Sequence, residues 1–218
     1  MTTNKFQRYF FLFIIIVFIM LPTDIDAKKQ QKSDVDIYEL SIDENISSPN
    51  LGKQDNSIIL FQAEQIKELN TLVERGYPYS IETLRNDEVI AITIQARHLF
   101  KPNEIVLSEN GKDKLKPILK YLKTKGLYKM VLAMHSDNTG NDFYCMTKTT
   151  KRVNAVFDWI QENKNISTEL VVPYALGNSD PIVDNNSILN RDKNRRLVIY
   201  LIPEKGMISQ AKKGSIKL

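Results

Sequence analysis

The apolar run MVLAM, from Met130 to Met134, constrains the fold more than any other feature of this sequence. Such a run, bounded by polar segments, is typical of a central strand that is covered on both faces. The polar segment HSDNTG, residues 135–140, follows directly, and Asn141 can then cap a helix whose apolar stripe runs from Met146 to Ile160. A buried strand, a polar loop and an amphipathic helix in succession predict a sheet with helices packed on it.

Strand and helix signals alternate on both sides of this segment. The turn Asn86-Asp87 joins two strand-like runs, and alternating isoleucines place one face of the second run in a core. An apolar helical stripe ends before Gly126, and Pro117 interrupts it, so this helix is either kinked or begins later than Ser108. Four further strands are expected at Ile81–Arg85, Val89–Ala96, Leu170–Leu176 and Leu197–Ile202.

The resulting order, β–β–α–β–α–β–β, predicts an α/β fold of the α+β sandwich type, with a mixed β-sheet and helices packed on it. Pro173 lies inside the strand expected at Leu170–Leu176. Because proline cannot donate to a sheet ladder, it predicts an edge position or a bulge for that strand.

The N-terminal residues have a different character. Lys5 and Arg8 precede an unbroken apolar and aromatic stretch, Tyr9 to Leu21, which is shorter than the span of about 20 residues that a membrane helix needs. This pattern favours a secretory signal peptide, with an uncleaved anchor as the alternative. The expected divisions are a signal peptide at 1–27, a polar linker at 28–57, a helical segment at 58–76, the main domain at 77–203 and a basic tail at 204–218.

The amino-acid composition of the chain excludes several classes of function. The chain has 30 Lys and Arg residues against 26 Asp and Glu, a net charge of +4. This excess is too mild to indicate nucleic acid as the partner. A single cysteine, Cys145, excludes an internal disulfide, and only two histidines are present. No metal site and no cofactor are therefore expected, and no set of nucleophile and base accompanies His135 to indicate an enzyme.

The polar loop after the MVLAM strand is the candidate binding site. It lies between the end of a strand and the start of a helix, where backbone N–H groups favour anionic ligands. Asp137 lies in this loop, and Arg152 shares one helical face with Cys145 and Thr149. Two interpretations stay open from spacing alone. Asp137 and Arg152 could bind the ammonium and carboxylate of an amino-acid head group, or they could form an ion pair that holds the loop to the helix.

Four motifs, in the same order along the chain, resemble those of the OmpA-like peptidoglycan-binding domain of bacterial envelope proteins. Leu99-Phe100, followed by Leu107 and Leu115, fits the family's first strand-to-helix junction. The family's Gly-His-Thr-Asp-Asn-Thr-Gly signature corresponds to MHSDNTG, residues 134–140, and its helix pattern corresponds to KTTKRVNAV, residues 148–156. Its late signature corresponds to Gly177, Pro181 and the NRRLVIY segment that begins at Asn194. The resemblance covers roughly residues 82–203, which is most of the chain after the signal peptide.

The resemblance implies non-catalytic binding of meso-diaminopimelate in the peptide stems of peptidoglycan. It assigns the ligand's ammonium to Asp137 and the carboxylate to Arg152, whose planar guanidinium suits bidentate pairing. The full set of ligand-binding residues that it implies is Asp137, Arg152, Ser136, Asn138, Thr149, Arg195 and Asn103. The expected partners are peptidoglycan and an outer-membrane protein, and the expected location is the periplasm, next to the cell wall or outer membrane.

Four residues depart from the family pattern in or next to these motifs. Met134 replaces a glycine, Cys145 replaces an asparagine that helps to hold the ligand, Lys148 replaces a leucine, and Val153 replaces an alanine. The lost asparagine removes one or two hydrogen bonds, each worth about 0.5–1.5 kcal/mol net. The alternative function is therefore an OmpA-like fold that has lost its ligand and serves as a protein–protein interaction module of the envelope.

Overall fold

The computed structural model of the chain describes residues 36–49 and 56–218. The expected signal peptide and most of the polar linker lie outside these residues. The contacts between residues divide the chain into two units, with the boundary after Glu39. Residues 36–39 form a turn in which the backbone N–H of Glu39 donates to the carbonyl of Asp36 at 2.9 Å. Residues 40–218 form one compact unit, which contains all the elements discussed below.

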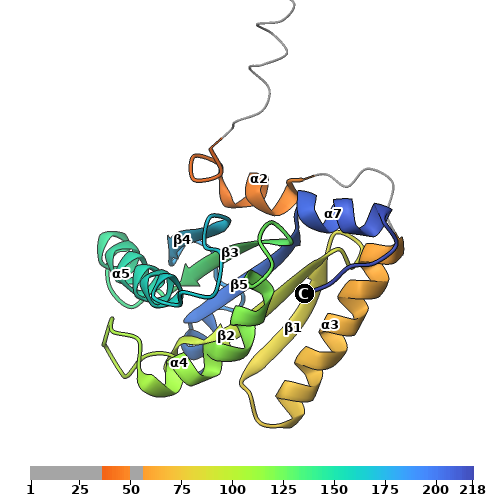
Figure 1. Cartoon of the computed structure of the whole chain (residues 1–218). Helices are drawn as coiled ribbons and strands as arrows, with labels where there is room; N and C mark the ends of the chain where they lie inside the picture. The colour runs from red at the N-terminus through yellow and green to blue at the C-terminus, as the bar shows by residue number, and fades with distance from the viewer. Residues whose placement is uncertain (1–35, 50–55) are drawn as a thin grey trace, which may run out of the picture. The chain divides into compact units, whose positions relative to one another are not determined.

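A five-stranded mixed sheet lies at the centre of this unit, in the order β1-β2-β5-β3-β4 (Figure 1). Neighbouring strands are antiparallel except for β3 and β4, which are parallel. The predicted fold class, a mixed sheet with helices packed on it, is confirmed, and Pro173 does lie on an edge strand. The strands are β1 Tyr79–Leu84, β2 Val89–Gln95, β3 Tyr128–His135, β4 Val171–Gly177 and β5 Arg196–Pro203.

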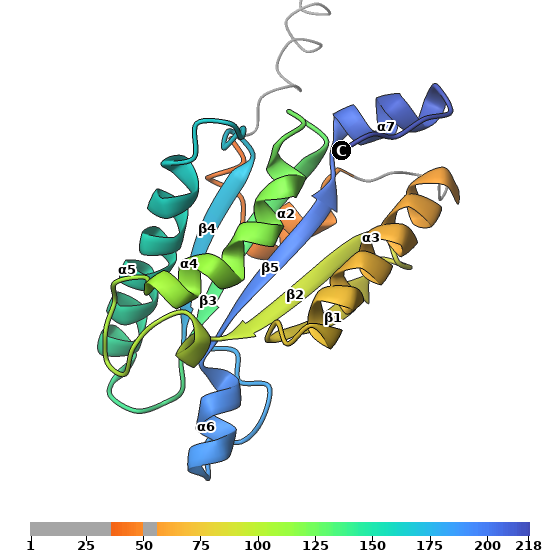
Figure 2. The same ribbon diagram turned by 60° about the horizontal axis from the view of Figure 1, so that its bottom comes forward.

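One face of the sheet carries the main core. Alternate residues of the inner strands, such as Ile92, Ile199 and Leu132, are buried there. Because side chains alternate along a strand, this single face takes every second residue. The helices on this face are α3 Asn56–Glu74, α4 Glu109–Leu115 and α5 Asp142–Gln161, and α4 continues as the 3₁₀-helix η2 Lys116–Leu122 (Figure 2). Pro117, at the start of η2, has no N–H with which to continue the α-helical ladder of α4.

The other face of the sheet is covered by the short helix α2, Ile42–Ser47. Ile42 packs on a small cluster that includes Ala133 of β3. The Nζ of Lys129, also on β3, donates to the Oδ1 of Asn45 at 3.0 Å and to the carbonyl of Ser48 at 2.6 Å. All eight residues of β3 are consequently buried, as expected for a strand that is covered on both faces.

The structure contains three helices that the sequence pattern did not predict. They are α2 within the polar linker, α6 Ile188–Asn194, and α7 Lys205–Lys212 within the basic tail. In α6 the apolar residues Ile188 and Leu189 are exposed, so no apolar stripe marks it. In α7, only Met207 and Ala211 are buried. The expectation that Met146 belongs to the core stripe of α5 is wrong, because Met146 is exposed.

Candidate functional site

A cavity of about 470 Å³ opens beside the carboxyl end of β3. The strand register explains its composition, because His135 of β3 and Gln95 of β2 both pair with Arg196 of β5. The residues that follow β3 and β2, and those that precede β5, therefore converge at one edge of the sheet. The cavity is lined by Ala96, Arg97, Phe100, Lys101, Pro102, Asn103, Ser136, Asp137, Thr139, Tyr144, Cys145, Lys148, Arg152, Asp192 and Arg195.

Asp137 is the buried acid of the cavity, with 5 % of its surface exposed. Its Oδ1 accepts the backbone N–H of Thr139 at 3.1 Å, and its Oδ2 is ion-paired with Nη1 of Arg195. The thiol of Cys145 donates to the backbone carbonyl of Asp137 at 3.4 Å. The loop conformation therefore fixes the carboxylate, and the residue that replaces the family's asparagine supports the loop's backbone.

Arg152 is the buried basic residue in the lining of the cavity, with 7 % of its surface exposed. Its Nε and Nη2 donate to the backbone carbonyl of Glu104 at 2.9 and 2.8 Å, and its guanidinium lies 4.8 Å from the ring centroid of Phe100. Burial, and then the nearby charge of Arg195, lower the pKa of Arg152 from its usual value. Within the described chain Nη1 makes no hydrogen bond, so this nitrogen can bind a ligand.

The spacing of Asp137 and Arg152 left open an ion pair between them. The structure instead pairs Asp137 with Arg195, whereas Arg152 holds the loop that contains Glu104. The structural role of Arg152 is therefore to fix the loop between β2 and α4. Neither side chain neutralises the other directly.

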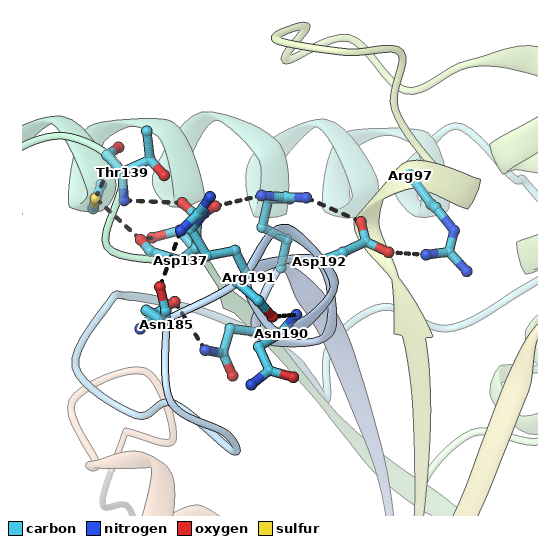
Figure 3. A network of polar contacts seen from close by, with 12 residues as sticks. Arg97, Asp137, Thr139, Asn185, Asn190, Arg191 and Asp192 are labelled. Carbon is cyan, nitrogen blue, oxygen red and sulfur yellow. Dashed lines mark hydrogen bonds and ion pairs between the residues drawn. The ribbon is translucent and has the colours of Figure 1, made fainter.

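The series of ion pairs that begins with Asp137 and Arg195 continues beyond Arg195. The Nη2 of Arg195 lies 3.1 Å from the Oδ1 of Asp192, which in turn is ion-paired with Arg97 of the 3₁₀-helix η1, Ala96–His98 (Figure 3). Asp192 precedes Arg195 by three residues, a spacing that brings side chains together at the end of α6. That spacing could have indicated Asp192 from the sequence, whereas Arg97 comes from a distant segment.

Asn194, the residue before Arg195, is held by hydrogen bonds to the segment that precedes α6. It is fully buried, and its Oδ1 accepts the backbone N–H groups of Ile182 and Val183 at 3.0 and 3.2 Å. Its Nδ2 donates to the carbonyl of Val183 at 2.8 Å and to the Oδ1 of Asn185 at 2.9 Å. Asn194 thus holds residues 182–185, part of the connection between β4 and α6, beside Arg195.

Arg196 points away from the cavity. It is buried, and its Nη2 lies 3.0 Å from the Oδ2 of Asp180. His135 lies next to it, and burial, followed by the charge of Arg196, lowers the pKa of His135 to about 4. His135 is therefore neutral at neutral pH and does not line the cavity.

The structure brings together five of the seven residues implied by the resemblance: Asp137, Arg152, Ser136, Arg195 and Asn103 all line the cavity. Asn138 is exposed and does not line it. Thr149 is also absent from the lining, because it is buried between α5 and β4. Its hydroxyl accepts the backbone N–H of Gly177 at 3.1 Å and donates to the carbonyl of Cys145 at 3.0 Å.

Sequence reasoning missed two lysines of the cavity as binding residues, Lys101 and Lys148. Lys148 lies 5.4 Å from the ring centroid of Tyr144, and its Nζ is 3.4 Å from the tyrosine hydroxyl. Its position four residues before Arg152 on the same helix was the available signal.

Two further classes of site are not found in the residues that the structure describes. No group of three or more His, Cys, Asp and Glu side chains could hold a metal ion there. In the same residues, no helix is both long and apolar enough to cross a membrane.

Comparison with known proteins finds a family that matches part of the chain. The OmpA family matches residues 99–195, which include all seven of the residues implied by the resemblance. YfiB of Escherichia coli is 27% identical over 103 residues, which cover 47% of this chain and 64% of YfiB. The match thus spans less than two thirds of that relative.

Solved structures share the fold at low identity. A MotB-like protein from Desulfovibrio vulgaris aligns with a TM-score of 0.58 at 18% identity, covering 69% of this chain and 99% of its own. The periplasmic domain of Helicobacter pylori MotB aligns with a TM-score of 0.51 at 16% identity, covering 62% of this chain and 88% of its own. At these identities the likeness establishes the fold alone.

Proposed function

Residues 99–195 of this chain match the OmpA family, and from this match we propose that the protein binds peptidoglycan without catalysis. The proposed ligand is the meso-diaminopimelate of the peptide stem, and the proposed site is the cavity that contains Asp137 and Arg152. The protein would thereby anchor the cell wall to the outer membrane or to an envelope complex, working in the periplasm after export by its N-terminal signal.

The observation that carries this proposal is the pair of oppositely charged, buried side chains on two walls of one cavity. Asp137 comes from the loop after β3 and Arg152 from the second half of α5, and they are not paired with each other. A zwitterionic head group offers one ammonium and one carboxylate, which match these two charges. The free Nη1 of Arg152 binds the carboxylate, and Asp137 shares its carboxylate between the ammonium and Arg195.

One site of this kind binds weakly, because a single small head group offers few contacts and Asp137 is already ion-paired. The cell wall, however, presents the same stem many times on one polymer. Attachment of several copies, or rebinding of one copy, raises the effective concentration without any new contact. A weak site therefore suffices for an anchor that must also release and rebind.

The test is retention of the full chain on purified insoluble peptidoglycan. Asp137→Ala and Arg152→Ala each remove a charge-assisted hydrogen bond, and we expect each to weaken retention about tenfold. Lys151→Ala and Asp158→Ala are matched controls, because both residues are exposed on α5 and do not line the cavity. Unchanged retention in both cavity variants, with folding verified by circular dichroism, would exclude this site.

A second function is favoured by exposed apolar residues on α5 and α6. Ile188 and Leu189 of α6 are 74% and 77% exposed, and Phe143 of α5 is 80% exposed. This apolar surface, together with Cys145 in place of the family's asparagine, supports a protein–protein interaction module that has lost the ligand. Titration with a stem peptide distinguishes the two functions, since an interaction module would show no shifted amide resonances near Arg152.

A further inference from the structure

The cavity carries more positive charge than a zwitterionic head group requires. Five cationic side chains and only two carboxylates line it, an excess of three positive charges. The cationic residues are Arg97, Lys101, Lys148, Arg152 and Arg195, and the carboxylates are Asp137 and Asp192.

The two carboxylates are already matched by two of the arginines. Asp137 pairs with Arg195, and Asp192 pairs with both Arg195 and Arg97. In the described part of the chain, the three remaining cations, Lys101, Lys148 and Arg152, form no ion pair with a carboxylate. The uncompensated charge therefore comes from α5 and from the loop that follows η1.

Lys148 is placed to extend the carboxylate-binding wall. It lies one helical turn before Arg152, so the two side chains project from the same face of α5. It is half-buried, its ammonium lies beside the ring of Tyr144, and Lys101 also lines the cavity. A partly shielded ammonium attracts a carboxylate more strongly than a fully solvated one, because water screens the pair less.

We infer that Lys148 binds a second carboxylate of the ligand, the C-terminal carboxylate of the residue that follows diaminopimelate in an uncross-linked stem. This inference rests on the proposed function and adds a selectivity to it. The site distinguishes stems by charge, preferring those with a free terminal carboxylate to those in which that group is consumed in an amide or cross-link. The protein then attaches preferentially to uncross-linked stems.

The experiment compares two synthetic stem tetrapeptides, one with a free terminal carboxylate and one with a terminal amide. Each is titrated into the full chain and followed by calorimetry. Wild-type protein is expected to bind the free acid about three- to fivefold tighter than the amide, the range for one partly exposed ion pair. Lys148→Gln should abolish this preference, whereas Lys151→Gln, which removes the same charge from the exposed face of α5, should keep it.

Salt provides a second readout that a purely structural role of Lys148 would not change. The wild-type preference should shrink as ionic strength rises, because screening weakens the added ion pair. Equal binding of both peptides by wild type, or an unchanged preference in Lys148→Gln, would refute the inference while leaving the proposed function intact. Binding of neither peptide by folded wild type would refute both.

Discussion

Lys129 offers the sharpest test of the structure outside the cavity. Its side chain is 1% exposed on β3, and burial lowers its pKa from 10.5 to about 8. The folded protein therefore releases this proton at a lower pH than the unfolded chain does. Between these two pKa values the unfolded state binds more protons, so the free energy of unfolding rises with pH.

The expected size follows from this difference. A shift from about 8 in the folded state to about 10.4 in the unfolded state adds about 1.5 kcal/mol between pH 8 and pH 9.5. The interval ends there because burial raises the pKa values of Tyr79, Tyr121 and Tyr128. Above pH 10 those tyrosines ionise only in the unfolded chain, which lowers stability again.

Urea unfolding in half-unit pH steps, followed by circular dichroism, measures this slope directly. Wild type should gain stability from pH 8 to pH 9.5, and Lys129→Met should remove that gain. Lys151→Met is the matched control, because Lys151 is exposed on α5 and should leave the slope unchanged. A flat wild-type profile, or an equal slope in Lys129→Met, would contradict the burial of Lys129 under the segment that contains α2.

Two further predictions concern packing and acid stability. A Cβ at Gly206 would lie 2.4 Å from the carbonyl oxygen of Gly126, so Gly206→Ala should lower the free energy of unfolding by about 1–3 kcal/mol in urea denaturation. Ser209→Ala, on the exposed side of the same helix, should be nearly neutral. Because the pKa of His135 is lowered to about 4, its contribution to stability is lost as pH falls from 6.5 toward 4. His135→Gln should reduce this acid sensitivity by up to about 3 kcal/mol, and an unchanged pH profile of unfolding would contradict the burial of His135.

The regular part of the fold was predictable because its signals are local. The apolar run of β3, the cap Asn141 and the alternating isoleucines of β2 each depend on a few neighbouring residues. The helices that were missed depend on distant contacts instead. Helix α2 is polar in sequence, and it is held to the sheet through Asn45, which donates to the hydroxyl of Tyr174 at 2.6 Å.

The sequence predicted which residues belong to the candidate site, but it did not predict which of them pair with one another. Asp137, Arg152 and Arg195 followed from motif positions, yet no spacing rule indicated that Asp137 pairs with Arg195 or that Arg152 bonds to the carbonyl of Glu104. Asp137 and Arg195 meet because β3 and β5 are neighbours in the sheet, and that register is a property of the whole fold. Thr149 illustrates the opposite error, since it shares a helical face with Arg152 but bonds to β4.

The pre-formed pair of Asp137 and Arg195 has a direct consequence for recognition. A ligand ammonium that approaches Asp137 encounters a carboxylate whose charge is already balanced, so its electrostatic gain is smaller than at a free acid. A carboxylate that approaches Lys148 and Arg152 encounters two cations without acidic partners in the described chain. We therefore expect the carboxylates of the ligand to contribute more to binding at this cavity than its amine does. Amidation of the ligand's carboxylates should accordingly weaken binding more than acetylation of its amine.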